Sequence, residues 1–140
     1  MLGGEKSIFQ ELSATLPIYD QAIYGVISEI CDRGLDKDML LVVCGEFGRT
    51  PWINKHGGRD HWAPCGSVLF AGGGLRMGQM IGDTGPIGER ECNRSQPYTA
   101  QNVLATIYRH LGIDPAMTVR TADGRSVPLL EDRRAIAELI

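Results

Sequence analysis

Apolar residues recur at helical spacing near the amino terminus. Ser7 and Gln10 have the spacing of a capping box, which predicts that a helix begins there. The apolar pattern continues beyond Pro17, so residues 17–33 are expected to form an amphipathic helix that ends at Gly34. Pro17 fits either the first turn of this second helix or a kink that joins the two helical stretches.

Three shorter segments have the composition of β-strands. Residues 39–44 are apolar at every position, which is typical of a strand covered on both faces in a parallel sheet. Residues 67–71 predict a second buried strand, and residues 78–82 predict a short third one. Helices and strands in this order indicate an α/β fold with a mainly parallel sheet, in which ligands bind beyond the carboxyl ends of the strands.

The remainder of the chain predicts a polar turn region, one more helix and a hairpin. Residues 83–97 form the turn region, and the helix begins at Thr99 and ends at Gly112. An Asp-Gly turn then predicts a small hairpin over about residues 118–130. With 140 residues and 43% hydrophobic positions, we expect residues 1–140 to form a single domain around one core.

A long glycine-rich loop is predicted over residues 45–66, between the two main strands. It contains both tryptophans and two of the three histidines. Loops longer than about 12 to 15 residues are usually functional or disordered, and the tryptophans argue against disorder. We therefore expect this loop to carry the functional site.

Glu46 and Arg49 are the first candidate residues of this loop, directly after the strand at 39–44. A carboxylate there can bind a divalent cation or accept a proton, and a guanidinium can bind phosphate or sulfate through two hydrogen bonds. Alternatively, Glu46 and Arg49 form an ion pair that only orders the loop.

Asp60 and His61, within the segment GRDHW, are the second pair of candidates. Histidine is the commonest metal ligand, and a neighbouring carboxylate often fixes its tautomer, so Asp60 is either a further ligand or this partner. On a loop, both side chains can reach one site. The alternative is a structural His61 packed against Trp62.

Composition and charge exclude several classes of protein. The formal net charge is −3 and the basic residues are scattered, which gives no support for nucleic-acid binding. No apolar run reaches the length of a membrane span, and the first ten residues lack the pattern of a secretory signal. The four cysteines have no CxxC spacing, so they do not predict a structural zinc site, and their disulfide status stays open: Cys31, Cys44, Cys65 and Cys92.

The motifs GEFGRTP and GRDHW together carry a family resemblance. The segment from LDKDMLLVVC through GEFGRTP and GRDHW to SVLFAGGG resembles the carboxyl-terminal part of the bacterial family known as domain of unknown function 1501. The flanking segments LPIYDQAI, TAQNVLATIYRHLGID and PLLEDRRAIAELI fit the same pattern. Members of this family are described as sulfatase-like and are placed in the alkaline phosphatase superfamily.

This resemblance implies a fold and a chemistry. It implies the carboxyl-terminal portion of a three-layer α/β sandwich, and hydrolysis of sulfate or phosphate esters at a site with one or two divalent metals. Glu46 and His61 match metal-ligand positions, with Asp60 as a further ligand or the partner of His61, and Arg49 as the contact to the substrate oxyanion. Phe47 stands where the superfamily has a histidine ligand, which favours a single metal or a harder cation such as calcium or magnesium over a two-zinc site.

The resemblance also implies that part of the domain lies outside these 140 residues. Relatives have an Asp/His motif where this chain has MLGGEKS, and the half of the domain that carries the nucleophile has no counterpart here. We therefore expect an incomplete metal site, no activity from this chain alone, and the missing amino-terminal half of the domain as a partner. Intact relatives are expected to be exported to the periplasm or the extracellular space, whereas no signal in this chain fixes its own location.

Two rival functions remain open at the level of the sequence. Phe47 in place of a ligand favours a non-catalytic binding or assembly module, in which a metal or an anion only stabilises the loop. A phosphotransferase that resembles phosphoglycerate mutase, from the same superfamily, is a further alternative.

Overall fold

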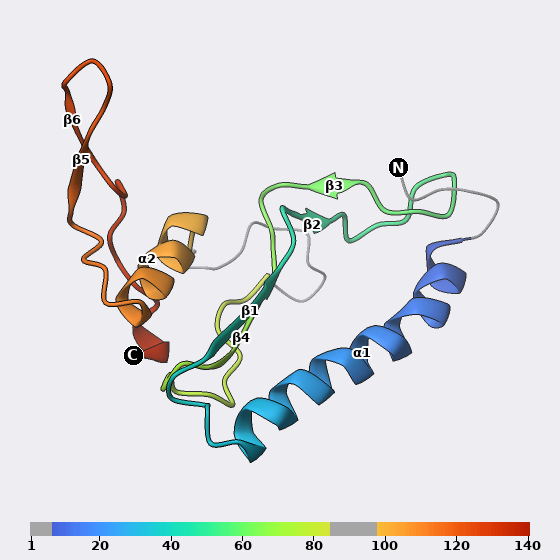
Figure 1. The fold of residues 1–140 in the computed structure, drawn as a ribbon. Helices are drawn as coiled ribbons and strands as arrows, with labels where there is room; N and C mark the ends of the chain where they lie inside the picture. The colour runs from blue at the N-terminus through green and yellow to red at the C-terminus, as the bar shows by residue number, and fades with distance from the viewer. Residues whose placement is uncertain (1–6, 85–97) are drawn as a thin grey trace.

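The computed structural model describes residues 7–84 and 98–140, and it has a mixed α/β fold. In the described residues, two α-helices accompany three two-stranded antiparallel sheets and a short 3₁₀ helix (Figure 1). None of these helices has the length and apolar character needed to cross a membrane. The elements are α1 (Ile8–Asp32), β1 (Leu40–Cys44), β2 (Gly48–Arg49), β3 (His61–Trp62), β4 (Val68–Gly72), α2 (Ala100–His110), β5 (Thr118–Arg120), β6 (Ser126–Pro128) and η1 (Ala137–Leu139).

Helix α1 is continuous, with Pro17 in its interior. The predicted capping box is confirmed, because the Ser7 N–H donates to Oε1 of Gln10 at 3.1 Å. The predicted end is also confirmed, since Gly34 has a φ of +67°, a left-handed conformation that glycine adopts without strain. Of the two alternatives for Pro17, the first turn of a separate second helix is wrong, because a single helix spans Ile8–Asp32 with Pro17 in its interior.

Substitution of Gly25 tests how much the conformational entropy of the backbone limits the stability of α1. A Cβ atom built at this position meets no atom within 4 Å, and the backbone is helical. Because alanine loses less conformational freedom than glycine in a helix interior, Gly25→Ala is expected to raise the free energy of unfolding by about 0.5–1 kcal/mol. Urea denaturation followed by circular dichroism measures this change, and an unchanged or lower midpoint would contradict it.

Strands β1 and β4 form the sheet at the centre of the chain. Both were predicted within a residue of their observed bounds, but they pair antiparallel, with Val42 opposite Phe70 and Leu41 opposite Ala71. The prediction of a mainly parallel sheet is therefore wrong for the described residues, where each sheet is antiparallel. A run of apolar residues predicted burial on both faces, yet Leu40 to Val43 are only half-buried.

The segment after β4 also departs from the prediction. Residues 78–82 form no strand, and they lie as irregular chain that contributes to a cavity of about 640 Å³ along β4. Apolar side chains dominate the lining of this cavity, including Leu69, Met77 and Val103. The polar turn region predicted at 83–97 lies almost entirely outside the described residues.

The best-packed part of the molecule is the carboxyl-terminal unit around α2. Asn102 and Ala105 of α2 have no exposed surface, and the segment with buried Ala135 and Ile136 packs against them. Nδ2 of Asn102 donates to the Arg134 carbonyl at 2.8 Å, which ties the helix to the end of the chain. The predicted helix start at Thr99 and the predicted hairpin, β5–β6, are both confirmed.

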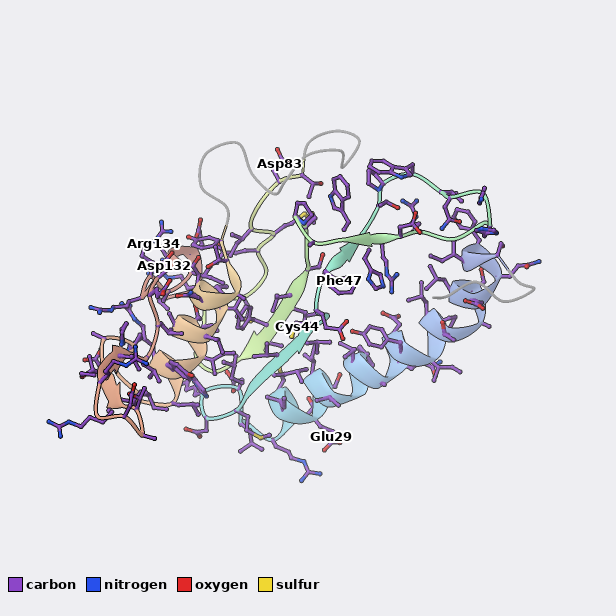
Figure 2. The ribbon with its side chains drawn as sticks, turned by 90° about the horizontal axis from the view of Figure 1, so that it is seen from above. Glu29, Cys44, Phe47, Asp83, Asp132 and Arg134 are labelled. Carbon is purple, nitrogen blue, oxygen red and sulfur yellow. The ribbon has the colours of Figure 1, made fainter. Side chains whose placement is uncertain are left out.

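A surface ion pair completes this unit. Nη2 of Arg134 lies 2.7 Å from a carboxylate oxygen of Asp132, and Figure 2 labels the two side chains together. Hydrogen bonds from the Arg134 guanidinium to Asp132 hold the pKa of that carboxyl well below its usual range. Arg134 is exposed and Asp132 is half-buried, so the pair fixes the local geometry of the chain more than it adds stability.

Candidate functional site

The segment predicted as a functional loop contains a short antiparallel hairpin, β2–β3. Arg49 on β2 lies directly opposite His61 on β3. The pairing continues one residue further, because the Thr50 N–H donates to the Asp60 carbonyl at 3.0 Å and the Asp60 N–H donates to Oγ1 of Thr50 at 3.1 Å. The hairpin thus fixes the relative positions of three of the four candidate residues.

The two faces of this hairpin carry different side chains. Neighbouring residues of an extended strand point to opposite faces, and residues directly opposite on paired strands share a face. Arg49 and His61 therefore share one face, and Asp60 and Trp62 point to the other. Phe47 joins the first face: its ring centroid lies 4.1 Å from that of His61, and the Arg49 guanidinium carbon lies 6.0 Å from the Phe47 ring.

The face formed by Phe47, Arg49 and His61, which we term the Arg–His face, is suited to an anion. Arg49 and His61 are exposed, and Phe47 is half-buried beneath them. One guanidinium nitrogen of Arg49 donates weakly to the Arg59 carbonyl at 3.4 Å, which leaves further N–H groups available. Guanidinium and imidazole N–H groups are strong donors to sulfate and phosphate oxygens. The ring of Phe47 limits the rotation of His61 and thus orients it.

Asp60 is held on the opposite side by Asn54. Nδ2 of Asn54 donates to Oδ1 of Asp60 at 2.9 Å, and Oδ1 of Asn54 accepts the N–H groups of His56 and Gly58, each at 3.0 Å. The sequence predicted that Asp60 and His61 can reach one site from a loop. The structure places His61 in β3 and Asp60 directly before it, with the Asp60 backbone hydrogen-bonded to Thr50. Extended chain directs neighbouring side chains to opposite faces, so the side chains of Asp60 and His61 point to different sides of the hairpin.

Glu46 lies in a bend between β1 and β2, with its side chain exposed. Within residues 7–84 and 98–140, Glu46 makes no ion pair with Arg49, so the alternative of a structural pair is not formed here. Glu46 lies two residues after the end of β1, beyond the end of the central sheet, as predicted.

The described residues do not fit a complete metal site. In the part of the chain that the structure describes, no three His, Cys, Asp or Glu side chains gather as a group that could hold a metal ion. Zinc sites in proteins use at least three protein ligands, and calcium uses more oxygens still. The prediction of Glu46, Asp60 and His61 as metal ligands stays a prediction, and any such site would need ligands from elsewhere.

Thr50 organises the hairpin, a role that the sequence did not reveal. It is 3% exposed, and its Oγ1 donates to the Trp52 carbonyl at 2.9 Å as well as accepting from Asp60. Nη1 of Arg59 donates to the Thr50 carbonyl at 2.6 Å. A threonine after an Arg carries no sequence signal for this role, because Arg59 and Asp60, which link it to the other side of the hairpin, lie nine and ten residues further along the chain.

Trp52 and Trp62 pack edge to face beside this hairpin, with ring centroids 5.1 Å apart. Nε1 of Trp62 is buried and has no hydrogen-bond partner among the described residues. The alternative left open by the sequence was a structural His61 packed against Trp62. The observed contact of Trp62 is with Trp52, and His61 packs against Phe47 instead.

The fold and the hairpin define a mixed α/β protein with an exposed Arg–His face beyond its central sheet. The chain matches the family described as "Protein of unknown function (DUF1501)" over residues 6–140, and it belongs to that family. Searches of curated proteins and of solved structures found no match.

Proposed function

We propose that this chain is the carboxyl-terminal segment of a sulfatase- or phosphatase-like hydrolase, and that its hairpin binds the oxyanion of the substrate. The observation that supports this proposal best is the Arg–His face, where Arg49 and His61 lie directly opposite each other and remain exposed. The substrate class would be sulfate or phosphate esters, whose charged oxygens these donors suit.

Each residue of the Arg–His face has a distinct role in this proposal. Arg49 donates two N–H groups to neighbouring oxygens of the ester, and His61 donates one more or transfers a proton to a leaving oxygen. Phe47 orients the imidazole through their ring contact, at 4.1 Å. Glu46 and His61, with Asp60 as a further candidate, remain the residues proposed to contact a divalent cation. No catalytic step is assigned to this cation, because the described residues do not form a complete metal site.

The proposal also identifies a partner for this chain and predicts that the chain has no activity on its own. The rest of the hydrolase domain, with the nucleophile and the remaining metal ligands, would be supplied from outside this chain. This chain alone is then expected to be inactive, and the intact protein is expected to be exported. Turnover of nitrophenyl sulfate or nitrophenyl phosphate by the purified chain, abolished by His61→Ala, would contradict the expected inactivity.

Binding of inorganic sulfate and phosphate tests the Arg–His face directly. In the wild-type chain, either anion is expected to shift the imidazole resonances of His61 in a saturable NMR titration. Arg49→Met is expected to weaken this binding at least about tenfold, which corresponds to about 1.4 kcal/mol and to the loss of one charge-assisted contact.

Arg120→Met is the matched control, because Arg120 is also an exposed arginine on a short strand, β5, away from the hairpin. It is expected to leave the affinity unchanged. Equal affinity in the Arg49 and Arg120 variants would mean that the anion binds by net charge alone, and the proposed role of the Arg–His face would fail.

A non-catalytic binding or assembly module is the second candidate function. The packing of Phe47 against His61 favours it, because an apolar ring occupies space next to the imidazole that a second ligand would otherwise use. Metal analysis of the purified protein separates the two functions. Bound metal that is lost on Glu46→Ala supports the hydrolase, and sulfate binding without any metal dependence supports the module.

A further inference from the structure

A second arginine, Arg59, belongs to the chain that forms the β2–β3 hairpin (Figure 1). It lies two residues before His61, where the Thr50 N–H joins the two strands by donating to the Asp60 carbonyl at 3.0 Å. Residues two apart in extended chain point to the same side. Arg59 and His61 therefore share one side of the hairpin, which is also the side of Arg49, opposite His61.

Two hydrogen bonds connect the side chains of Arg49 and Arg59 to opposite strands of the hairpin. Nη1 of Arg49 donates to the Arg59 carbonyl at 3.4 Å, and Nη1 of Arg59 donates to the Thr50 carbonyl at 2.6 Å. Each guanidinium thus lies against the stretch of backbone from which the other arginine extends. Arg59 is half-buried and makes the shorter bond, so it is held more firmly than the exposed Arg49.

Both guanidinium groups keep N–H groups for a ligand. A guanidinium has five N–H donors in a planar fork, and the two hydrogen bonds to backbone carbonyls use one donor of Arg49 and one of Arg59. A carbonyl oxygen accepts a hydrogen bond without neutralising the charge of the donor. Two like charges held on one side of a small hairpin repel each other, and an anion bound by both relieves this repulsion.

The carboxylate next to Arg59 in the sequence is directed away from these two charges. Asp60 points to the other side of the hairpin, where Nδ2 of Asn54 donates to its Oδ1 at 2.9 Å. Within residues 7–84 and 98–140, neither Arg49 nor Arg59 forms an ion pair. The described residues therefore place two positive charges on the face that is proposed to bind the substrate.

Two positive charges distinguish between the two classes of ester named in the proposed function. A phosphate monoester carries two negative charges above its second pKa of about 6, whereas a sulfate ester carries one. Both have three terminal oxygens that guanidinium groups can bind, so charge and not shape separates them. Coulomb attraction grows with the product of the charges, so a second arginine strengthens binding of the dianion more than binding of the monoanion.

We propose that Arg59 is a second anion-binding arginine of the Arg–His face, and that Arg49 and Arg59 together select phosphate monoesters over sulfate esters. This inference rests on the proposed function, which places the oxyanion of the substrate on this face. It adds a binding role for Arg59, which no motif in the sequence assigned, and it chooses one of the two ester classes. The proposed function stands without it, because Arg49 and His61 alone suit either ester.

Three small anions separate the effect of charge from that of the central atom. At about pH 8, methyl phosphate is a dianion, whereas methyl sulfate and dimethyl phosphate are monoanions. Each is titrated into the wild-type chain, and binding is followed through the imidazole resonances of His61. Methyl phosphate is expected to bind at least about tenfold more tightly than either monoanion, and the two monoanions are expected to bind about equally.

Substitutions of Arg59 test whether its charge causes this preference. Arg59→Met is expected to reduce the preference for methyl phosphate to less than about threefold, by weakening the dianion while the monoanions stay within about twofold of wild type. Arg59→Lys keeps the charge and is expected to keep most of the preference. Lys55→Met is the matched control, because it removes one positive charge from an exposed position four residues away, and it is expected to leave the preference unchanged.

A purely structural role for Arg59 predicts a different result. If Arg59 only braces the Thr50 carbonyl, Arg59→Met weakens all three anions by the same factor, and the inference is overturned. Should Arg59→Met fail to fold, Arg59→Gln keeps an N–H donor without the charge and is expected to lose the preference in the same way.

Two further results distinguish failure of this inference from failure of the proposed function. Equal binding of the three anions to the wild-type chain, still weakened by Arg49→Met, would overturn the selection of phosphate monoesters and leave the proposed function standing. Anion binding that does not depend on Arg49 would overturn both.

Discussion

Gly48→Ala is expected to disrupt the hairpin and with it the Arg–His face. A Cβ atom at residue 48 would collide with the backbone carbonyl of Cys65, which the Gly48 N–H also meets in a short hydrogen bond. A backbone carbonyl cannot turn aside as a flexible side chain can, so the strand must shift. We expect a loss of about 3 kcal/mol in the free energy of unfolding, typical of an overpacked site, and loss of sulfate binding at His61.

Gly66→Ala is the control for this prediction, because a Cβ atom there meets nothing within 4 Å. It lies close to Cys65 in the sequence and should leave both stability and anion binding nearly unchanged. Urea denaturation and the NMR titration of His61 measure the two effects. Wild-type behaviour in Gly48→Ala would mean that the approach of β2 to Cys65 is not needed for the site.

Asn102→Ala is expected to destabilise the carboxyl-terminal unit by about 3 kcal/mol, since it removes the hydrogen bonds of a fully buried side chain and leaves a cavity in its place. The Asn102 side chain has no exposed surface, accepts the Thr99 N–H at 2.7 Å and donates to the Arg134 carbonyl at 2.8 Å. Alanine removes both hydrogen bonds and leaves a small cavity. Chemical denaturation measures the loss.

Gln10→Ala is the matched control, because Gln10 has the same capping role at the start of α1 that Asn102 has in α2. Gln10 is exposed, so water replaces its hydrogen bond to the Ser7 N–H, and we expect a loss of about 0.5–1 kcal/mol. Equal effects of the two substitutions would show that burial does not contribute to the role of Asn102.

The sequence predicted most of the local structure correctly. Capping residues and apolar periodicity located α1 and α2, and an Asp-Gly turn located the β5–β6 hairpin. These signals act within a few residues of one another. The sequence could not place the sheet pairing, because an apolar run such as residues 39–44 is compatible with either strand direction and with partial exposure.

The sequence identified the candidate residues, but it did not predict which of their side chains lie on the same face of the hairpin. Glu46, Arg49, Asp60 and His61 all lie in the predicted loop, and family membership over residues 6–140 agrees with the motifs that carry the resemblance. Adjacent Asp60 and His61 were expected at one site, and the β2–β3 pairing separates them. The role of Thr50 escaped prediction because Arg59 and Asp60, its partners across the hairpin, are nine and ten residues away in sequence.

The sequence by itself therefore determined the helices, their caps, the positions of the main strands and the family. Only the tertiary structure decided that β1 and β4 are antiparallel, that Arg49 lies opposite His61, and that Phe47 packs against that histidine. The physical reason is the distance along the sequence between the residues that interact. Helix caps and turns depend on hydrogen bonds between near neighbours, whereas strand direction and register depend on contacts between residues ten to thirty positions apart, which no local pattern of side chains encodes.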